Sequence, residues 1–142
     1  MRAGRRDVPL THSDKVLFPD DGLTKADLAA YYRDVAPAMV ELVRDRPVSL
    51  LRFNNGIAKP GFFQKNVEKG APDWVKRVQV AKKGGSLWHV LANDAATLVW
   101  LANQNCITPH VWLARADRLE RPDRMIFDLD PASADDFALV RR

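Results

Sequence analysis

The stretch Val48-Ser49-Leu50-Leu51-Arg52-Phe53 decides the fold class, because it is a short, mostly apolar run of the kind found in strands. Three more short runs of this kind follow it, at residues 62–65, 75–80 and 87–91. Clusters of Gly, Pro and Asn separate the runs, as expected of turns between strands. We therefore predict an antiparallel meander in this part of the chain.

Helical patterns lie on both sides of these strands. From Thr24, apolar residues recur at spacings of three and four until residue 43, and Thr24 with Asp27 has the pattern of a capping box. Pro37 lacks an amide donor, so we expect a kink there or a second short helix that begins at that residue. A further helix is predicted to end at residue 103, with Asn93 or Asp94 as its cap.

Two more strands, residues 107–113 and 125–130, are predicted after that helix, joined by the charged connection 115–124. Ser133 then caps a last predicted helix up to residue 142. The expected fold class is α/β of the α+β type, a mixed or antiparallel sheet with flanking helices. Because the sequence stops shortly after its most chemical-looking strand, the domain looks incomplete.

Length and composition favour a single globular domain. The chain has 142 residues, of which 46% are hydrophobic, and its net charge of +4 is compatible with a polyanionic partner but modest for one. No apolar run is long enough for a membrane span, so we expect a cytoplasmic protein. Residues 1–9 are expected to be a disordered, basic N-terminus. The single Cys106 is interpreted as a small buried hydrophobe.

The clearest candidate for chemistry is the run Met125-Ile126-Phe127-Asp128-Leu129-Asp130-Pro131. In a strand, Asp128 and Asp130 would project from one face with their Cα atoms about 6.5 to 7 Å apart. That spacing suits two carboxylates that bind hard cations such as Mg²⁺ or Mn²⁺. The alternative is an ordinary strand end with two solvated acids.

Two adjacent aromatic residues, Phe62 and Phe63, form the second signal. Neighbouring residues of a regular strand face opposite ways, so both rings cannot enter one core unless the backbone bends. An exposed ring between Gly61 and Lys65 would make a platform for stacking bases. The alternative is that both rings are buried in two layers of core.

Basic residues provide the remaining candidates. Lys15 and Lys25 flank a turn, and Lys25 falls in the first turn of a predicted helix, where an anion is favoured. Solvated surface lysines are the alternative. His110 lies within a predicted strand and is either a phosphate contact or a neutral core histidine. Arg52 ends the apolar strand and is either a phosphate ligand or part of a rim salt bridge.

Several motifs, taken together and in order, resemble the polymerase domain of bacterial ATP-dependent DNA ligase D, a primase-polymerase of non-homologous end joining. The resemblance covers nearly all of the chain from Leu10 onward and corresponds to the N-terminal half of that domain, residues 10–142. The motifs are Thr11-His12-Ser13-Asp14-Lys15-Val16-Leu17-Phe18-Pro19, Thr24-Lys25-Ala26-Asp27-Leu28 with Tyr31-Tyr32, Arg46-Pro47, Phe62-Phe63-Gln64-Lys65, Asn93-Asp94-Ala95-Ala96-Thr97-Leu98, Pro122-Asp123-Arg124 and Phe127-Asp128-Leu129-Asp130-Pro131.

The resemblance implies an archaeo-eukaryotic primase-like fold and a nucleotidyltransferase that adds NTP or dNTP at DNA double-strand breaks by a two-metal mechanism. It implies that Asp128 and Asp130 bind catalytic Mn²⁺ or Mg²⁺, and that Lys15 and Lys25 hold the 5′-phosphate of a gapped or broken DNA end. It also implies that Phe62 and Phe63 stack near the template base. His110 would contact the nucleotide triphosphate, and Arg52 is assigned, less firmly, to the nucleotide site. The implied partners are DNA ends, NTP or dNTP, Ku and a ligase module, in the bacterial cytoplasm at the nucleoid.

This sequence also departs from the family pattern. The third catalytic acid of the family is expected downstream of Arg142, and Ser13 stands where a Pro is expected. We therefore expect little or no polymerase activity from the chain alone. Two alternatives stay open: a non-catalytic fragment that binds 5′-phosphorylated DNA ends, and a truncated gene product whose exposed sheet edge makes it poorly stable or self-associating.

Overall fold

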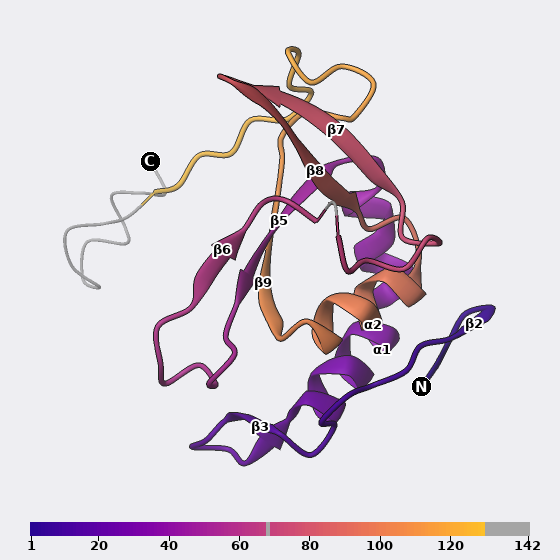
Figure 1. Cartoon of the computed structure of the whole chain (residues 1–142), viewed down its shortest axis with the longest axis vertical. Helices are drawn as coiled ribbons and strands as arrows, with labels where there is room; N and C mark the ends of the chain where they lie inside the picture. Colours follow the sequence, from indigo (N-terminus) through magenta and orange to yellow (C-terminus); the bar gives the residue numbers. More distant parts are fainter. Residues whose placement is uncertain (68, 130–142) are drawn as a thin grey trace.

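The computed structural model describes residues 1–67 and 69–129 of the chain. Two helices pack against one face of an antiparallel sheet, and two small hairpins lie near the N-terminus (Figure 1). The first hairpin pairs β1 (Arg2–Ala3) with β2 (Arg6–Asp7), and the second pairs β3 (Val16–Phe18) with β4 (Leu23–Thr24). The predicted α+β class with an antiparallel sheet and flanking helices is confirmed.

The N-terminus differs from the expected disordered tail. The hairpin β1–β2 is closed by the N-terminal ammonium group, which donates to the Val8 carbonyl at 2.7 Å. Ala3 and Val8 are buried in the main core, and the Arg6 guanidinium lies 5.3 Å from the centre of the Trp74 ring. Basic composition suggested a solvated tail, but two small apolar residues are enough to attach this segment to the body.

Helix α1 (Lys25–Val43) begins at a complete capping box. The Thr24 side chain accepts from the Asp27 amide, and the Asp27 carboxylate accepts from the Thr24 amide at 2.7 Å. The helix runs through Pro37 without dividing, so of the two expectations at this residue, a kink or a second short helix, the second is wrong. Pro37 is exposed, so water can solvate the carbonyl four residues earlier that loses its amide partner.

The main sheet contains five strands in the described residues: β5 (Pro47–Arg52), β6 (Phe62–Gln64), β7 (Arg77–Lys82), β8 (Gly85–Leu91) and β9 (Cys106–Val111). β5 pairs with β9 along one edge and with both β8 and β6 along the other. A meander would place β6 between β5 and β7. Instead, β6 and β8 both pair with β5, and β7 pairs with β8, so the predicted simple meander is wrong. β5 is paired on both edges, and its first four residues are all buried.

Alternation along β5 gives the sheet two different faces. Val48 and Leu50 point to the helices and are almost completely buried, whereas Ser49 and Leu51 point to the open face. Helix α2 (Ala95–Asn103) covers the helix side, with Asp94 as its N-cap, and Cys106 is buried there as predicted. Packing of α1 and α2 on this face produces one continuous core.

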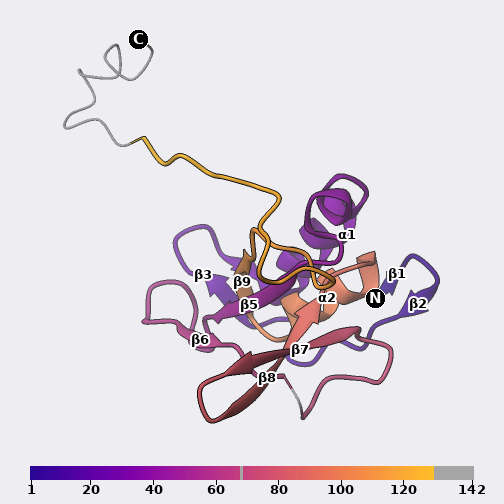
Figure 2. The same cartoon turned by 90° about the horizontal axis from the view of Figure 1, so that it is seen from above.

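The predicted strand at residues 125–130 is absent from the described part of the chain. Residues 124–129 have no strand pairing and lead away from the sheet (Figure 2). Their apolar side chains are exposed, with Phe127 at 76%. A strand needs a partner edge for its amides and carbonyls, and in this structure the run has none. Asp130 and the predicted helix at 133–142 lie outside the described residues.

Membrane insertion by a helix finds no support in this fold. Neither helix of the described residues combines the length and apolar character that crossing a bilayer requires.

Candidate functional site

An aromatic ring and a histidine meet on the open face of the sheet. Phe63 lies opposite Leu51, and His110 lies opposite Ser49, so both side chains project from the same face as these two residues of β5. Their rings meet edge to face with centroids 4.9 Å apart. Phe63 remains 54% exposed and His110 is exposed as well. This pair is open to a ligand and is not part of the core.

The neighbouring Phe62 takes the opposite face, as alternation requires. Its ring, 45% exposed, lies 5.4 Å from the Arg52 guanidinium. The expectation that the two rings do not share one core agrees with the structure. Gly61 lets the start of β6 lie close to the end of β5, because a Cβ atom there would lie 2.9 Å from the Phe53 ring and 3.0 Å from the Arg52 carbonyl oxygen.

Arg52 is held at the end of the sheet by two hydrogen bonds. Its Nε donates to the Gln104 carbonyl and its Nη1 donates to the Gln64 side-chain oxygen, both at 2.6 Å. The guanidinium is therefore not an independent surface charge. Sequence reasoning did not single out Gln64 as the residue that orients Arg52. Its place in the same short motif as the two phenylalanines was the available signal.

Lys25 is buried, which differs from the alternative of a solvated surface lysine. Its ammonium donates to the Thr11 carbonyl at 2.8 Å and to the Asn103 carbonyl at 3.2 Å. Lys25 and Arg52 thus bind the consecutive carbonyls of Asn103 and Gln104 at the C-terminal end of α2, where cations are favoured. Two of its three ammonium protons are thus used within the described residues.

The first amides of α1 are not free for an anion, contrary to the expected helix N-terminal site. The Lys25 amide donates to the Lys15 carbonyl at 2.8 Å, and the Ala26 amide donates to the Ser13 carbonyl at 2.9 Å. The Asp27 amide donates to the Thr24 hydroxyl. An anion at this point must therefore be bound by side chains, because the backbone donors of the first turn are already used.

Three positive charges gather where α1, α2 and β5 come together. Burial lowers the pKa of Lys25, and the nearby charges of Lys15 and Arg52 lower it further. Lys15 is half-buried, and within the described residues its ammonium makes no hydrogen bond or ion pair. No carboxylate of residues 1–67 or 69–129 pairs with any of the three cations. We call Lys15, Lys25 and Arg52 the cation cluster.

The structure does not bring the candidate metal ligands to these residues. Asp128 is exposed and lies in the segment that leads away from the sheet, and Asp130 is outside the described residues. No group of three or more His, Cys, Asp or Glu residues within 1–67 and 69–129 is placed to hold a metal ion. Carboxylate oxygens are the donor type that hard divalent cations prefer, so the chemistry of Asp128 fits such an ion.

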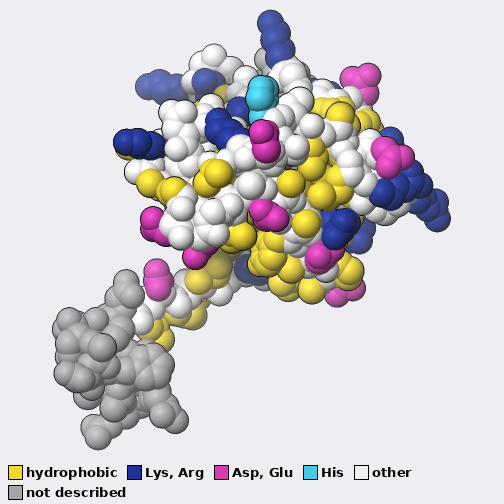
Figure 3. All heavy atoms as spheres, turned by 90° about the horizontal axis from the view of Figure 1, so that it is seen from below, with side chains coloured by type: hydrophobic (Ala, Val, Ile, Leu, Met, Phe, Trp, Pro, Cys, Tyr) yellow, Lys and Arg dark blue, Asp and Glu magenta, His cyan; other side chains and the backbone are white. Residues whose placement is uncertain are grey.

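Apolar side chains gather on a neighbouring surface. Figure 3 views the end of the molecule at which β3 lies in Figure 1 and shows a broad apolar area with Lys and Arg side chains at its margins. The elements β3, β4, α1 and β9 form a groove of about 340 Å³ there. Its lining consists of Phe18, Leu23, Asp27, Leu28, Tyr31, Tyr32 and Ile107.

Comparison with known proteins identifies the family. The sequence profile described as LigD, primase-polymerase domain, matches residues 24–142. The chain is 37% identical over 126 residues to the multifunctional non-homologous end joining protein LigD of Mycolicibacterium smegmatis, which covers 87% of this chain and 16% of that protein. It is 34% identical over 133 residues to the bifunctional non-homologous end joining protein LigD of Bacillus subtilis, which covers 94% of this chain and 21% of that protein.

A solved structure agrees with this result. The polymerase domain from Mycobacterium tuberculosis ligase D in complex with DNA superposes with a TM-score of 0.73 at 38% identity, covering 77% of this chain and 38% of that chain. The chain therefore belongs to the LigD primase-polymerase family, and the resemblance of its motifs to that family is confirmed. It spans about a fifth or less of the two curated relatives and 38% of the solved polymerase chain.

Proposed function

We propose that this chain is part of a DNA repair polymerase that transfers nucleotides to DNA ends during non-homologous end joining, and that its cation cluster binds the 5′-phosphate of the DNA. The observation that carries the proposal is the cluster itself. Three cations lie together without a carboxylate partner in the described residues, next to an aromatic ring that is nearly half exposed. A bound phosphate would supply the missing negative charge.

Within the cluster, the three cations have different parts. Lys15 has all its ammonium donors available and makes the main direct contact. Lys25 acts mainly through its charge because it is buried and bonded to the Thr11 and Asn103 carbonyls, and Arg52 acts mainly through its charge because Gln104 and Gln64 hold it in place. The solved relative at 38% identity is described as a complex with DNA, which supports a nucleic-acid partner for this fold.

The open face supplies the second half of the proposed site. Phe63 and Phe62 offer their exposed rings to bases near the end of the template, where base stacking on an aromatic ring contributes about 1–3 kcal/mol per base. His110 lies against Phe63 and is placed to contact the triphosphate of an incoming NTP or dNTP. The two rings, on opposite faces of β6, would contact different parts of the DNA.

Asp128 and Asp130 are proposed to hold Mg²⁺ or Mn²⁺, which would supply positive charge for activating the primer 3′-hydroxyl and for neutralising the triphosphate. In an extended strand, residues two apart share a face, so the two carboxylates would act together. Ku and a ligase module are proposed partners because the relatives are multifunctional end-joining proteins.

Binding to a gapped DNA with and without a 5′-phosphate tests the proposal. We expect the phosphate to tighten binding by about tenfold or more, and Lys15→Ala to remove most of that difference, since a charge-assisted contact to phosphate contributes about 1.5–3 kcal/mol. Lys76→Ala, an exposed lysine before β7, is the matched control. Equal affinity for both DNAs would contradict the assignment of the cation cluster.

A non-catalytic DNA-end binder is the second candidate, because Asp128 lies apart from His110 and Phe63 in this structure. Primer extension by the purified chain, measured with Mn²⁺ present, separates the two functions. The end-binding function predicts phosphate-dependent binding without nucleotide incorporation.

A further inference from the structure

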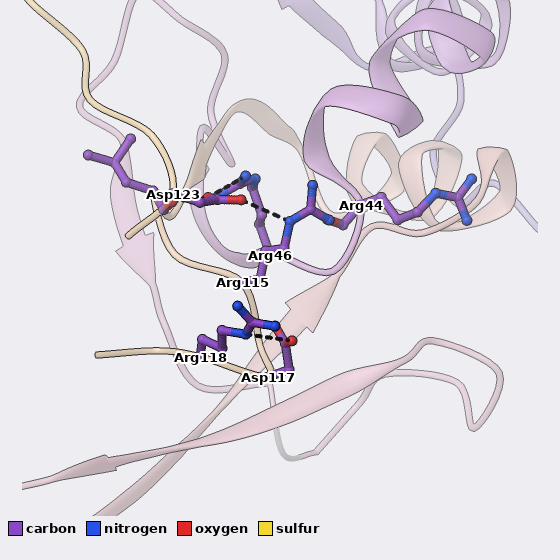
Figure 4. Close-up of polar contacts among 7 residues, drawn as sticks. Arg44, Arg46, Arg115, Asp117, Arg118 and Asp123 are labelled. Carbon is purple, nitrogen blue, oxygen red and sulfur yellow. Dashed lines mark hydrogen bonds and ion pairs between the residues drawn. The ribbon is translucent and has the colours of Figure 1, made fainter. Parts of the chain in front are cut away.

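An ion pair between a buried arginine and an exposed aspartate fastens the loop that precedes residues 124–129. The Arg46 side chain is only 1% exposed, and its Nη2 lies 2.6 Å from Oδ1 of Asp123 (Figure 4). Its Nη1 donates to the Leu113 carbonyl at 2.5 Å. Asp123 also pairs with Nε of Arg115 at 3.0 Å, and both arginines lower the pKa of its carboxyl group. One guanidinium thus holds both ends of the loop 113–123.

The turn between α1 and β5 supplies further contacts to this loop. The Ala116 amide donates to the Asp45 carbonyl at 2.7 Å, and Nη1 of Arg115 donates to the Arg44 carbonyl at 3.5 Å. Asp45 itself is held by two hydrogen bonds with the Asn93 side chain. These contacts therefore fix the position of Asp123, the residue after which residues 124–129 lead away from the sheet.

A single backbone hydrogen bond sets a register at this point. The Asp123 amide donates to the Leu113 carbonyl at 3.3 Å. The Trp112 amide donates to Pro47 of β5, so the odd-numbered residues 113, 111, 109 and 107 direct their backbone groups to the outer edge of β9. No strand of the described residues pairs with that outer edge. If the chain continued this pairing beyond the Asp123–Leu113 bond, residues 124–129 would lie antiparallel to β9 along its outer edge.

We propose that the Arg46–Asp123 ion pair is the anchor that fixes the register in which residues 125–129 add to the outer edge of β9. Asp123 is then a positioning residue for Asp128. The inference rests on the proposed function, because that function gives Asp128 its role in the site. It extends the proposal by naming the contact that brings this acid to the other site residues.

The pairing that continues from Asp123 and Leu113 places Asp128 on the same face of the sheet as the other site residues. Each step forward from Asp123 matches one step back from Leu113, so Ile126 falls opposite His110 and Asp128 falls opposite Thr108. Directly opposite residues share a face, which puts Asp128 on the open face with His110 and Phe63.

The same register turns the apolar side chains of the segment inward. Phe127 and Leu129 would face the helix side, where Ile107 lines the apolar groove beside α1. A one-residue slip would reverse this arrangement and place Asp128 against the groove. Burial of the two apolar side chains thus favours the proposed face, but it cannot by itself distinguish registers that differ by two residues.

The available backbone bonds cannot set this register firmly by themselves. Pro109 has no amide to donate, and the Tyr32 hydroxyl already donates to the Ile107 carbonyl at 2.9 Å. The remaining ladder is short, so a fixed starting point matters more than it would for a longer strand. Asp123 provides that point through the buried guanidinium of Arg46.

Disulfide trapping measures the register without DNA or metal. In the full chain, Thr108→Cys is combined with either Asp128→Cys or Ile126→Cys, and we expect the pair at 108 and 128 to cross-link about tenfold faster, because disulfides require Cα atoms closer than about 7 Å. Cys106 is buried, and burial raises the pKa of its thiol to about 12, so it does not compete.

Two insertions separate anchoring from general stability. Two glycines inserted after Asp123 should move the preferred partner of position 108 from residue 128 to residue 126. The same insertion after Glu120, inside the exposed loop and before the anchor, should leave the preference at residue 128. An altered fold alone would not transfer the cross-link by two positions.

Substitution tests the ion pair directly. Asp123→Asn should abolish the preference for position 128, Asp123→Glu should restore part of it, and Arg115→Ala should leave it unchanged because Arg46 remains paired. Thermal unfolding of each variant confirms that it is folded at the trapping temperature.

The proposal would be overturned by an unchanged preference in a folded Asp123→Asn variant, by no cross-linking at either position, or by cross-links only between two copies of the chain. Loss of phosphate-dependent DNA binding alongside an intact register would instead contradict the proposed function alone.

Discussion

Strand β5 and the run 125–129 are similar as sequences but differ in the structure. Both are short apolar runs that predict a strand. β5 has neighbours on both edges and its residue Leu50 is fully buried, whereas Phe127 is 76% exposed and its run is unpaired in the described structure. The comparison teaches that an apolar pattern defines a strand only where a partner edge is in place.

The largest expected effect follows from this contrast in burial. Leu50→Ala should lower the free energy of unfolding by about 2–5 kcal/mol, because it leaves a cavity in a closed core. Phe127→Ala is the matched comparison, and while the run stays unpaired, as in this structure, it should change that free energy by less than about 0.5 kcal/mol. Urea denaturation measures both values, and a larger loss for Phe127→Ala would mean that the run packs against the body, as its proposed pairing with β9 requires.

A second prediction contrasts two exposed aromatic residues. Phe63→Ala should weaken binding to gapped DNA by about 1–3 kcal/mol, since it removes a stacking surface. Tyr31→Ala removes a ring of similar exposure from the groove beside α1 and should leave DNA affinity unchanged. Equal losses for the two variants, measured by fluorescence anisotropy, would argue against a specific role for the open face.

A third prediction concerns the start of α1, the element that carries Lys25. Thr24→Ala removes the side chain that accepts from the Asp27 amide and should lower the free energy of unfolding by about 1 kcal/mol. Ser13→Ala removes an exposed hydroxyl that makes no hydrogen bond within the described residues, and it serves as the control. Thermal unfolding monitored by circular dichroism would distinguish them, and identical melting curves would contradict the capping role.

The smallest expected effect is a pH dependence at Asp123. Hydrogen bonds from Arg46 and Arg115 lower the pKa of Asp123 below its ordinary value of 3.8. Its contribution to stability is therefore complete above that value and is lost as the pH falls through the lowered pKa of the folded state. Asp123→Asn should be less sensitive to acid than the wild-type chain between about pH 5 and pH 2, as measured by urea denaturation.

Sequence reasoning predicted the elements whose determinants are local. The capping box at Thr24, the second helix from Asp94 and the central strand near Val48 all depend on neighbouring residues. The order of the strands was not predictable in the same way, because β8 pairs with β5 across more than forty residues of chain. Burial of Ala3 and Val8 likewise depends on distant partners that the basic composition of the tail does not indicate.

The candidate site shows the same division. Alternation along a strand predicted that Phe62 and Phe63 would face opposite ways. The burial of Lys25 and its bonds to the end of α2 required the three-dimensional fold. The free helix amides expected at this site are not available, because carbonyls from a preceding turn, including that of Lys15, accept from the first amides of α1. Phosphate binding by the Lys15 and Lys25 side chains stays a prediction.

The central claim is that the cation cluster receives a phosphate. Its most direct test is the pKa of the Lys25 ammonium, measured by NMR with and without a 5′-phosphorylated oligonucleotide. Burial and the charges of Lys15 and Arg52 hold that pKa below its usual value of 10.5, and a bound phosphate should raise it because it favours the charged form. A rise with the phosphorylated oligonucleotide, absent with the unphosphorylated one, is the predicted result. An unchanged pKa at saturating oligonucleotide would contradict the account.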